Sequence, residues 1–282
     1  MKSVTFILFI LMSNTFAAAQ SINQHSQRGK NKVTRSNKNY TVTVADGNSR
    51  CQILINDVPL VYYEGSGERS FLANSAILNS GEQTVKIVTN GKIPTVTINE
   101  TYNKRGEYAK TEIWKNNGVL KGNFTAEVPY SNIGWDKSRI ISKDSAMFKE
   151  ANIWFQNMSN LLEAGKGKEF MKFLIPAERL AALMYNLTPE ETARFHSNWI
   201  SFISRKAFSL VPLSDCEIEI VGNGRLFHLT NNLNEGGFAL VADNGQILFL
   251  DIYLHVPTAS SRVEPILANF KQITSDFKRR LE

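Results

Sequence analysis

Hydrophobic and polar residues alternate in short runs from Tyr40 to about Val128. Period-two alternation, or enrichment in β-branched residues, predicts a strand in each run. Turn residues such as Asn56-Asp57 and Asn90-Gly91 separate the runs and accept the positive φ that hairpin turns require. We therefore expect an all-β, sandwich-like domain over residues 40–135. The expected strands are Tyr40–Val44, Cys51–Ile55, Gln83–Val88, Thr95–Ile98, Tyr108–Trp114 and Val119–Val128.

The spacing of apolar residues changes to a helical period after a connector that contains Pro129, Gly134 and Trp135. A stripe at i, i+3, i+4 and i+7 predicts a first helix that ends at Gly165. The residues of this stripe are Phe148, Ala151, Trp154, Phe155, Met158, Leu161 and Leu162. A shorter helix is expected over Pro176–Tyr185.

A third helix has a complete N-terminal signal. Thr188 is suited to the N-cap, Pro189 to the first helical position, and Glu191 to the third position of a capping box. The apolar face expected for this helix contains Phe195, Trp199 and Phe202.

Strand patterns return after Pro212 and predict a four-stranded antiparallel meander. A final helix is expected after Pro265, with Ile266, Phe270, Ile273, Phe277 and Leu281 on one stripe. Residues 142–282 therefore form an expected α+β domain, with helices packed on one face of the sheet. The fold class predicted for the whole chain is two-domain: an all-β sandwich-like module, then this α+β domain with its C-terminal helix. The four expected strands are Cys216–Val221, Arg225–Thr230, Phe238–Ala242 and Gln246–Val256.

The N-terminus has the pattern of a cleavable signal peptide over residues 1–19. Lys2 is followed by the apolar run Phe6–Met12 and by the small residues Ala17-Ala18-Ala19. A buried N-terminal helix is the alternative interpretation. No cysteine lies near the expected cleavage site, so no lipid anchor is expected, and no run is long enough for a membrane span. The sequence therefore predicts a secreted or periplasmic protein.

The net charge of +6 does not indicate a nucleic-acid partner, because it is concentrated in residues 1–39. That segment holds six basic residues and no acidic one, so the chain from Tyr40 onward is neutral. Residues 20–39 are rich in Ser, Asn and Gln and read as a disordered basic spacer, or as a loose tether to anionic polymers. The folded part lacks the basic footprint of a nucleic-acid-binding protein.

No pattern in the sequence identifies a cofactor or a metal. The nucleophile elbow, the zinc-protease helix, the phosphate-binding loop and the dinucleotide fingerprint are all missing. Cys51 and Cys216 lie on the apolar sides of different strands, which favours two buried thiols over a disulfide. With only four histidines and two distant cysteines, we expect no metal site and no cofactor.

The candidates for catalysis lie on the last expected strand. Alternation places Asp251, Tyr253 and His255 on the face opposite the helices, and His228 on a neighbouring strand can reach the same face. An acid, a phenol and imidazoles on one surface are suited to proton transfer. Asp251 and His255 are about 13 Å apart along a strand, so another strand must complete any pair. The alternative interpretation is the polar, wet face of a half-buried sheet.

Aromatic residues of the β module are the candidates for ligand binding. Tyr62, Tyr63, Trp114 and Trp135 could stack on a sugar or anchor a protein, and packing inside the sandwich is the alternative. We therefore expect a non-enzymatic exported protein that binds a protein or glycan partner. The rival hypothesis is an exported hydrolase that uses the sheet face of Asp251, Tyr253, His255 and His228.

Overall fold

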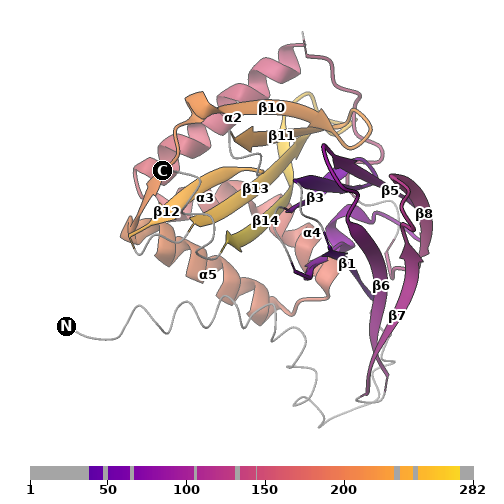
Figure 1. Ribbon diagram of the computed structural model, residues 1–282. Coiled ribbons are helices and arrows are strands. Elements are labelled where there is room, and N and C mark those ends of the chain that lie inside the picture. The colour runs from indigo at the N-terminus through magenta and orange to yellow at the C-terminus, as the bar shows by residue number, and fades with distance from the viewer. Residues whose placement is uncertain are drawn as a thin grey trace.

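The computed structural model describes residues 38–46, 50–63, 67–104, 107–130, 134–143, 145–231, 236–243 and 247–273. The signal peptide, most of the basic spacer and residues 274–282 lie outside the described residues. Two four-stranded antiparallel sheets form the N-terminal part (Figure 1). One sheet has the order β4(Arg69–Leu72), β1(Asn39–Ala45), β6(Thr95–Lys104), β7(Glu107–Lys115). The other has the order β3(Val58–Tyr63), β2(Cys51–Ile55), β5(Gly81–Thr89), β8(Lys121–Ala126).

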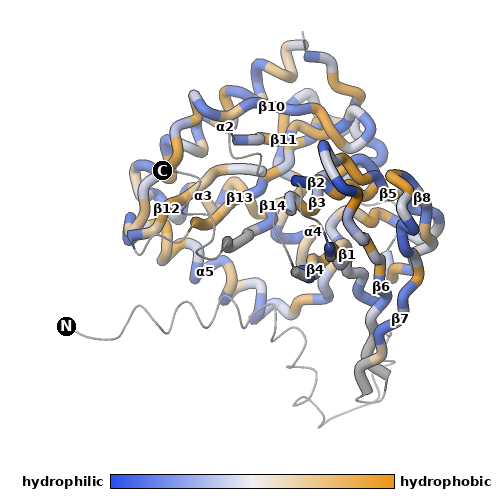
Figure 2. The backbone as a smooth tube through the Cα atoms, in the orientation of Figure 1, coloured by the Kyte–Doolittle hydropathy of each residue, from blue (hydrophilic) through white to orange (hydrophobic). Residues whose placement is uncertain are grey.

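The two sheets share one core, as expected for a sandwich. Figure 2 shows hydrophobic and polar residues alternating along β5 and β8, and buried and exposed positions alternate along the same strands. Val42 of β1, Ile53 of β2 and Ile87 of β5 belong to the same buried cluster. Strands β3 and β4 were not predicted, because β3 is buried on nearly every residue and β4 is only four residues long. Neither strand shows a period of two.

Four helices follow: α2(Ala146–Glu163), α3(Gly167–Phe173), α4(Ile175–Tyr185) and α5(Pro189–Arg205). The capping box of α5 is confirmed, because Thr188 accepts from the Glu191 amide and the Glu191 carboxylate accepts from the Thr188 amide at 2.8 Å. Helix α3 was not predicted. It packs on α5 so closely that a Cβ on Gly167 would collide with the carbonyl oxygen of Ile200.

The second half of the chain contains a six-stranded sheet. Its strands are β9(Phe208–Leu210), β10(Cys216–Val221), β11(Leu226–Asn231), β12(Phe238–Ala242), β13(Ile247–His255) and β14(Glu264–Ile273). The predicted four-stranded meander is wrong, because the order is β10-β11-β13-β12-β9, with β14 on the other edge of β13. β13 pairs with β12 along its first half and with β11 along its second half, so the sheet curls.

The predicted C-terminal helix is also wrong in the described residues. Glu264–Ile273 forms β14, which pairs with β13 from His255 back to Ile247. Ile266 and Phe270 fit a helical stripe, but a full ladder of backbone hydrogen bonds is available beside β13. Tertiary pairing of this kind overrides a short periodic pattern.

The six-stranded sheet lies between two different layers. Residues of α2, α3 and α5 pack with Leu250, Ile252 and Leu254 in one core cluster. Tyr253 and Leu267 point the other way and join the core of the sandwich, together with Leu180 of α4. The described residues are mostly β, with four helices. Because one buried cluster joins both halves, the division into two domains stays a prediction.

Strands β11 and β12 pair with different halves of β13, and Gly237 lies where the chain enters β12. Gly237 has φ of +84°, and a Cβ at this position would collide with the Leu250 carbonyl. Gly118 is a matched control, with φ of +82° and open space around it. Gly118→Ala should lower the free energy of unfolding by about 1–2 kcal/mol, from the left-handed backbone alone. Gly237→Ala should lower the free energy of unfolding by about 1–3 kcal/mol more than Gly118→Ala, because of the clash. Equal losses of unfolding free energy for the two variants, measured by urea unfolding, would contradict the close packing of Gly237 on β13.

Candidate functional site

Three of the four candidate catalytic residues, His228, Asp251 and Tyr253, come together on β11 and β13. His228 and Tyr253 are register partners, and their rings stack at 4.4 Å with an interplanar angle of 8°. His228 Nε2 lies 2.7 Å from Asp251 Oδ1. A second strand therefore completes the pair with Asp251, as the alternation along the two strands suggested. We call Asp251, Tyr253 and His228 the buried triad.

The face that carries the buried triad is not wet. All three side chains are 0% exposed. The hydroxyl of Tyr253 donates to the carbonyl oxygen of Pro59 at 2.7 Å, so strand β3 of the sandwich covers this face. The predicted wet polar face is therefore wrong, because the N-terminal part packs on it.

Burial controls the electrostatics of the triad. The pKa of Tyr253 is raised well above its usual value, first by desolvation and then by the negative charge of Asp251. Tyr253 therefore stays protonated and acts as a hydrogen-bond donor. His228 Nδ1 has no hydrogen-bond partner among the described residues. Tyr253 connects the triad to the sandwich through Pro59, and its hydroxyl also lies 3.3 Å from Asp251 Oδ2, so the three side chains form one buried polar network.

Among the described residues, Gly236 occupies the space directly beside the triad. Gly236 lies against it so closely that a Cβ there would collide with Asp251 Oδ1 and His228 Nε2. A general base must come within hydrogen-bond reach of the proton that it abstracts. The geometry therefore suits a structural role for these three residues.

His255 has a separate environment from the triad. Its Nδ1 lies 2.7 Å from the hydroxyl of Ser138, and its side chain is 8% exposed. Ser138 belongs to the connector between the sandwich and α2, and its carbonyl also accepts a hydrogen bond from Arg225. Burial lowers the pKa of His255 to about 4. His255 is therefore neutral at pH 7 and anchors the connector to β13.

The four aromatic candidates for ligand binding are largely used in packing. Tyr63 and Trp135 are 1% and 2% exposed, whereas Tyr62 and Trp114 are half-buried. The indole of Trp114 occupies the space where Gly122 of β8 would carry a side chain. Packing inside the sandwich thus explains Tyr63, Trp114 and Trp135.

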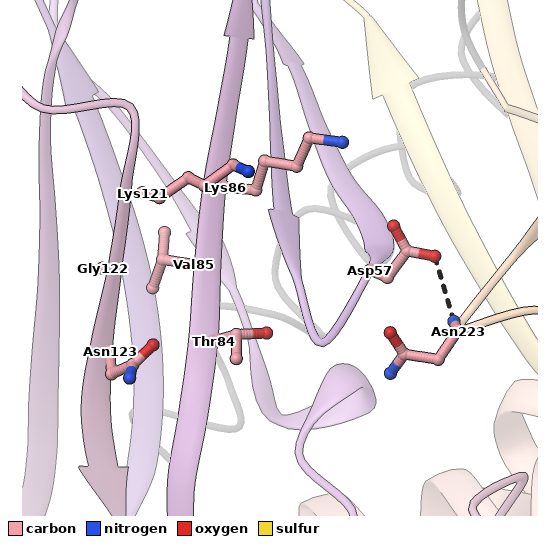
Figure 3. A pocket seen from close by; sticks show the side chains of 8 residues that line it. All are labelled: Asp57, Thr84, Val85, Lys86, Lys121, Gly122, Asn123 and Asn223. Carbon is pink, nitrogen blue, oxygen red and sulfur yellow. Dashed lines mark hydrogen bonds between the residues drawn. The ribbon is translucent and has the colours of Figure 1, made fainter.

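A surface hollow of about 400 Å³ lies on the outer face of β5 and β8. Its walls are the two strands, the β2–β3 turn and the β10–β11 turn (Figure 3). Six of the eight lining residues have polar or charged side chains. The lining residues are Asp57, Thr84, Val85, Lys86, Lys121, Gly122, Asn123 and Asn223.

Two hairpin turns meet at the edge of this hollow. Asn56 and Asp57 have φ of 51° and 63°, the geometry of a type I′ turn. The Asp57 carboxylate accepts from the amide of Asn223 at 3.0 Å, and the Asp57 carbonyl accepts from the amide of Gly222 at 3.0 Å. The hollow is therefore built jointly by the sandwich and the six-stranded sheet.

The residues of the hollow were not among the candidates predicted from the sequence. The outward side of β5 carries Thr84 and Lys86, and that of β8 carries Lys121 and Asn123. Alternation alone marks these side chains as exposed. Nothing in the sequence shows that β5 pairs with β8, which lies some 30 residues further along the chain. The meeting of Asp57 with Asn223 is equally nonlocal.

The described residues contain no group of three or more His, Cys, Asp or Glu side chains that could hold a metal. Both cysteines are free thiols, with Cys51 buried and Cys216 half-buried. Among the described helices, none is long and apolar enough to cross a membrane. The chain matches no model of a protein family, no curated protein and no solved structure.

Removal of Asp251 should destabilise the protein strongly, because His228 would lose its partner in a dry site. We expect Asp251→Ala to lower the free energy of unfolding by about 3–5 kcal/mol. Glu178→Ala is the control, since Glu178 contacts His196 at the same 2.7 Å but the imidazole is 30% exposed. That pair should be worth about 1 kcal/mol or less. Denaturant unfolding at pH 7 measures both, and similar losses would contradict the structural role of the triad.

The stability of the protein should fall in mild acid because of His255. The pKa of His255 is about 4 in the folded state, against 6.5 for a solvent-exposed histidine as in the unfolded chain, so the unfolded chain binds the proton first. The contribution of neutral His255 to the free energy of unfolding is fully present above pH 6.5 and is lost as the pH falls toward 4. The loss should be on the order of 3 kcal/mol.

His255→Asn tests this assignment, because the amide oxygen can still accept from Ser138 but does not titrate. The variant should show a shallower decline of unfolding free energy between pH 6.5 and 4. The same slope in both proteins would exclude His255 as the source.

Proposed function

We propose that the protein is a non-enzymatic binding protein of the secreted or periplasmic fraction, and that the hollow on β5 and β8 receives its ligand. The observation that carries this proposal is the lining of the hollow. Hydroxyl, amide, ammonium and carboxylate groups converge there from two strands and two turns. A volume of about 400 Å³ falls within the range of small-molecule sites, roughly 300–1,000 Å³.

The geometry of the candidate residues favours binding over the rival hydrolase hypothesis. Asp251, Tyr253 and His228 are fully buried, and none of them lines the hollow. His255 has its Nδ1 engaged by Ser138. The rival hypothesis requires at least one of these four groups to face a substrate.

The expected two-domain organisation is part of the same proposal. The sandwich, residues 40–135, would supply most of the binding surface, and the α+β part, residues 142–282, would supply one wall through Asn223. The predicted signal peptide supports export to a compartment where a glycan or a protein partner is available.

A thermal-shift screen of the purified protein against soluble glycans and peptides tests this function. A ligand at 100 times its Kd stabilises a protein by about 2.7 kcal/mol, which at roughly 2–4 °C per kcal/mol is easily measured. The double variant Thr84→Ala/Asn123→Ala should lose the shift, because both polar groups leave the hollow. The matched control Thr111→Ala/Asn152→Ala changes the same residue types at exposed positions elsewhere and should keep it.

Two outcomes would overturn the proposal. One is a ligand shift that survives in the Thr84/Asn123 variant, which would place the ligand elsewhere. The other is hydrolysis of a screened compound by the wild-type protein that is lost in His228→Gln while the fold is retained.

A further inference from the structure

We infer that the hollow recognises an anionic saccharide, that is, a hydroxylated ligand with a carboxylate, phosphate or sulfate group held by Lys86 and Lys121. This inference rests on the proposed function and specifies its ligand. It depends on the register of two strands, on the charges of the described residues, and on the distribution of polar groups around the hollow.

Lys86 and Lys121 are direct register partners on β5 and β8, and both side chains are exposed. Partners of this kind have Cβ atoms about 4.5–5.5 Å apart, so like charges repel each other. Figure 3 shows the two side chains extending next to each other at one end of the hollow. Neither lysine forms an ion pair within the described part of the chain. An oxyanion between the two ammonium groups would relieve this repulsion.

The carboxylate of the hollow does not neutralise the lysine pair. Asp57 is held by the β10–β11 turn, where its Oδ2 accepts from the amide of Asn223. With two ammonium groups and one carboxylate, the hollow keeps a net positive charge. Charge-assisted hydrogen bonds to an anion, about 2.7–2.9 Å long, are stronger than neutral ones.

The remaining groups suit hydroxyls and not hydrocarbon. Thr84 and Asn123 are register partners two residues along from the lysine pair, about 7 Å away at ~3.3 Å per residue. Asn223 faces them from the other wall (Figure 3). Hydroxyl and amide groups both donate and accept, as sugar hydroxyls do. An acid group at one end and hydroxyls at the other describe an acidic sugar.

Titration calorimetry with the purified protein tests the ligand class. The probes are a galacturonic acid hexamer, a sulfated heparin-derived hexasaccharide, neutral maltohexaose, and sodium phosphate alone. We expect at least one acidic oligosaccharide to bind ten times more tightly than maltohexaose. Its affinity should fall as NaCl is raised from 50 to 500 mM, because salt screens exposed charges.

Charge-matched variants test the residues. Lys86→Gln/Lys121→Gln should weaken binding of the acidic oligosaccharide at least tenfold. The control Lys149→Gln/Lys168→Gln removes the same net charge from exposed helix positions and should leave binding within twofold. Equal effects of the two variants would overturn the lysine pair as the anion site.

The results separate this inference from the proposed function. If maltohexaose binds as tightly as the acidic probes and Thr84→Ala/Asn123→Ala abolishes binding, the anionic class is wrong and the binding site stands. If phosphate alone binds as tightly as the oligosaccharides, the ligand is a free anion and the saccharide part is wrong. If no saccharide binds, the saccharide inference fails, and if no glycan or peptide of the thermal-shift screen responds to Thr84→Ala/Asn123→Ala, the proposed function fails as well.

Discussion

Strand β13 is the element on which the rest of the structure depends, because it is paired along both edges and buried on both faces. Its leucine side packs on the helices, and its Asp251–Tyr253 side packs on the sandwich. A strand enclosed in this way cannot leave polar groups unpaired, since each would cost about 1–3 kcal/mol. The hydrogen bonds of Tyr253 to Pro59 and of Asp251 to His228 follow from that constraint.

The same constraint decides where chemistry is available. An acid, a phenol and an imidazole resemble a catalytic group when they are placed on an exposed face, but here they are inside the joint between two layers. Their contacts stabilise that joint. Solvent-facing polar groups are found instead on the outer face of β5 and β8, where the alternation of the sandwich strands directs Thr84 and Lys86 outward.

Local signals in the sequence were sufficient for local structure. The capping box at Thr188 and Glu191 placed the start of α5 correctly, and the Asn56-Asp57 pair marked a hairpin turn that has positive φ at both residues. The failures are nonlocal. Glu264–Ile273 becomes a strand because β13 offers a free edge, and Tyr253 is buried because the distant strand β3 lies against it. The periodicity of residues within a segment does not indicate which distant segment packs on it.

Asp57 connects the hollow to the interface between the sandwich and the six-stranded sheet. Its carbonyl and one carboxylate oxygen hold the Gly222-Asn223 turn, and the same turn brings the Asn223 side chain into the lining. The shape of the hollow therefore depends on the packing of the six-stranded sheet against the sandwich, which in turn depends on the triad around β13. A ligand that contacts both Lys86 and Asn223 would add a further connection between the two parts. Binding and the stability of the joint should consequently strengthen each other, because a ligand stabilises the state that it binds.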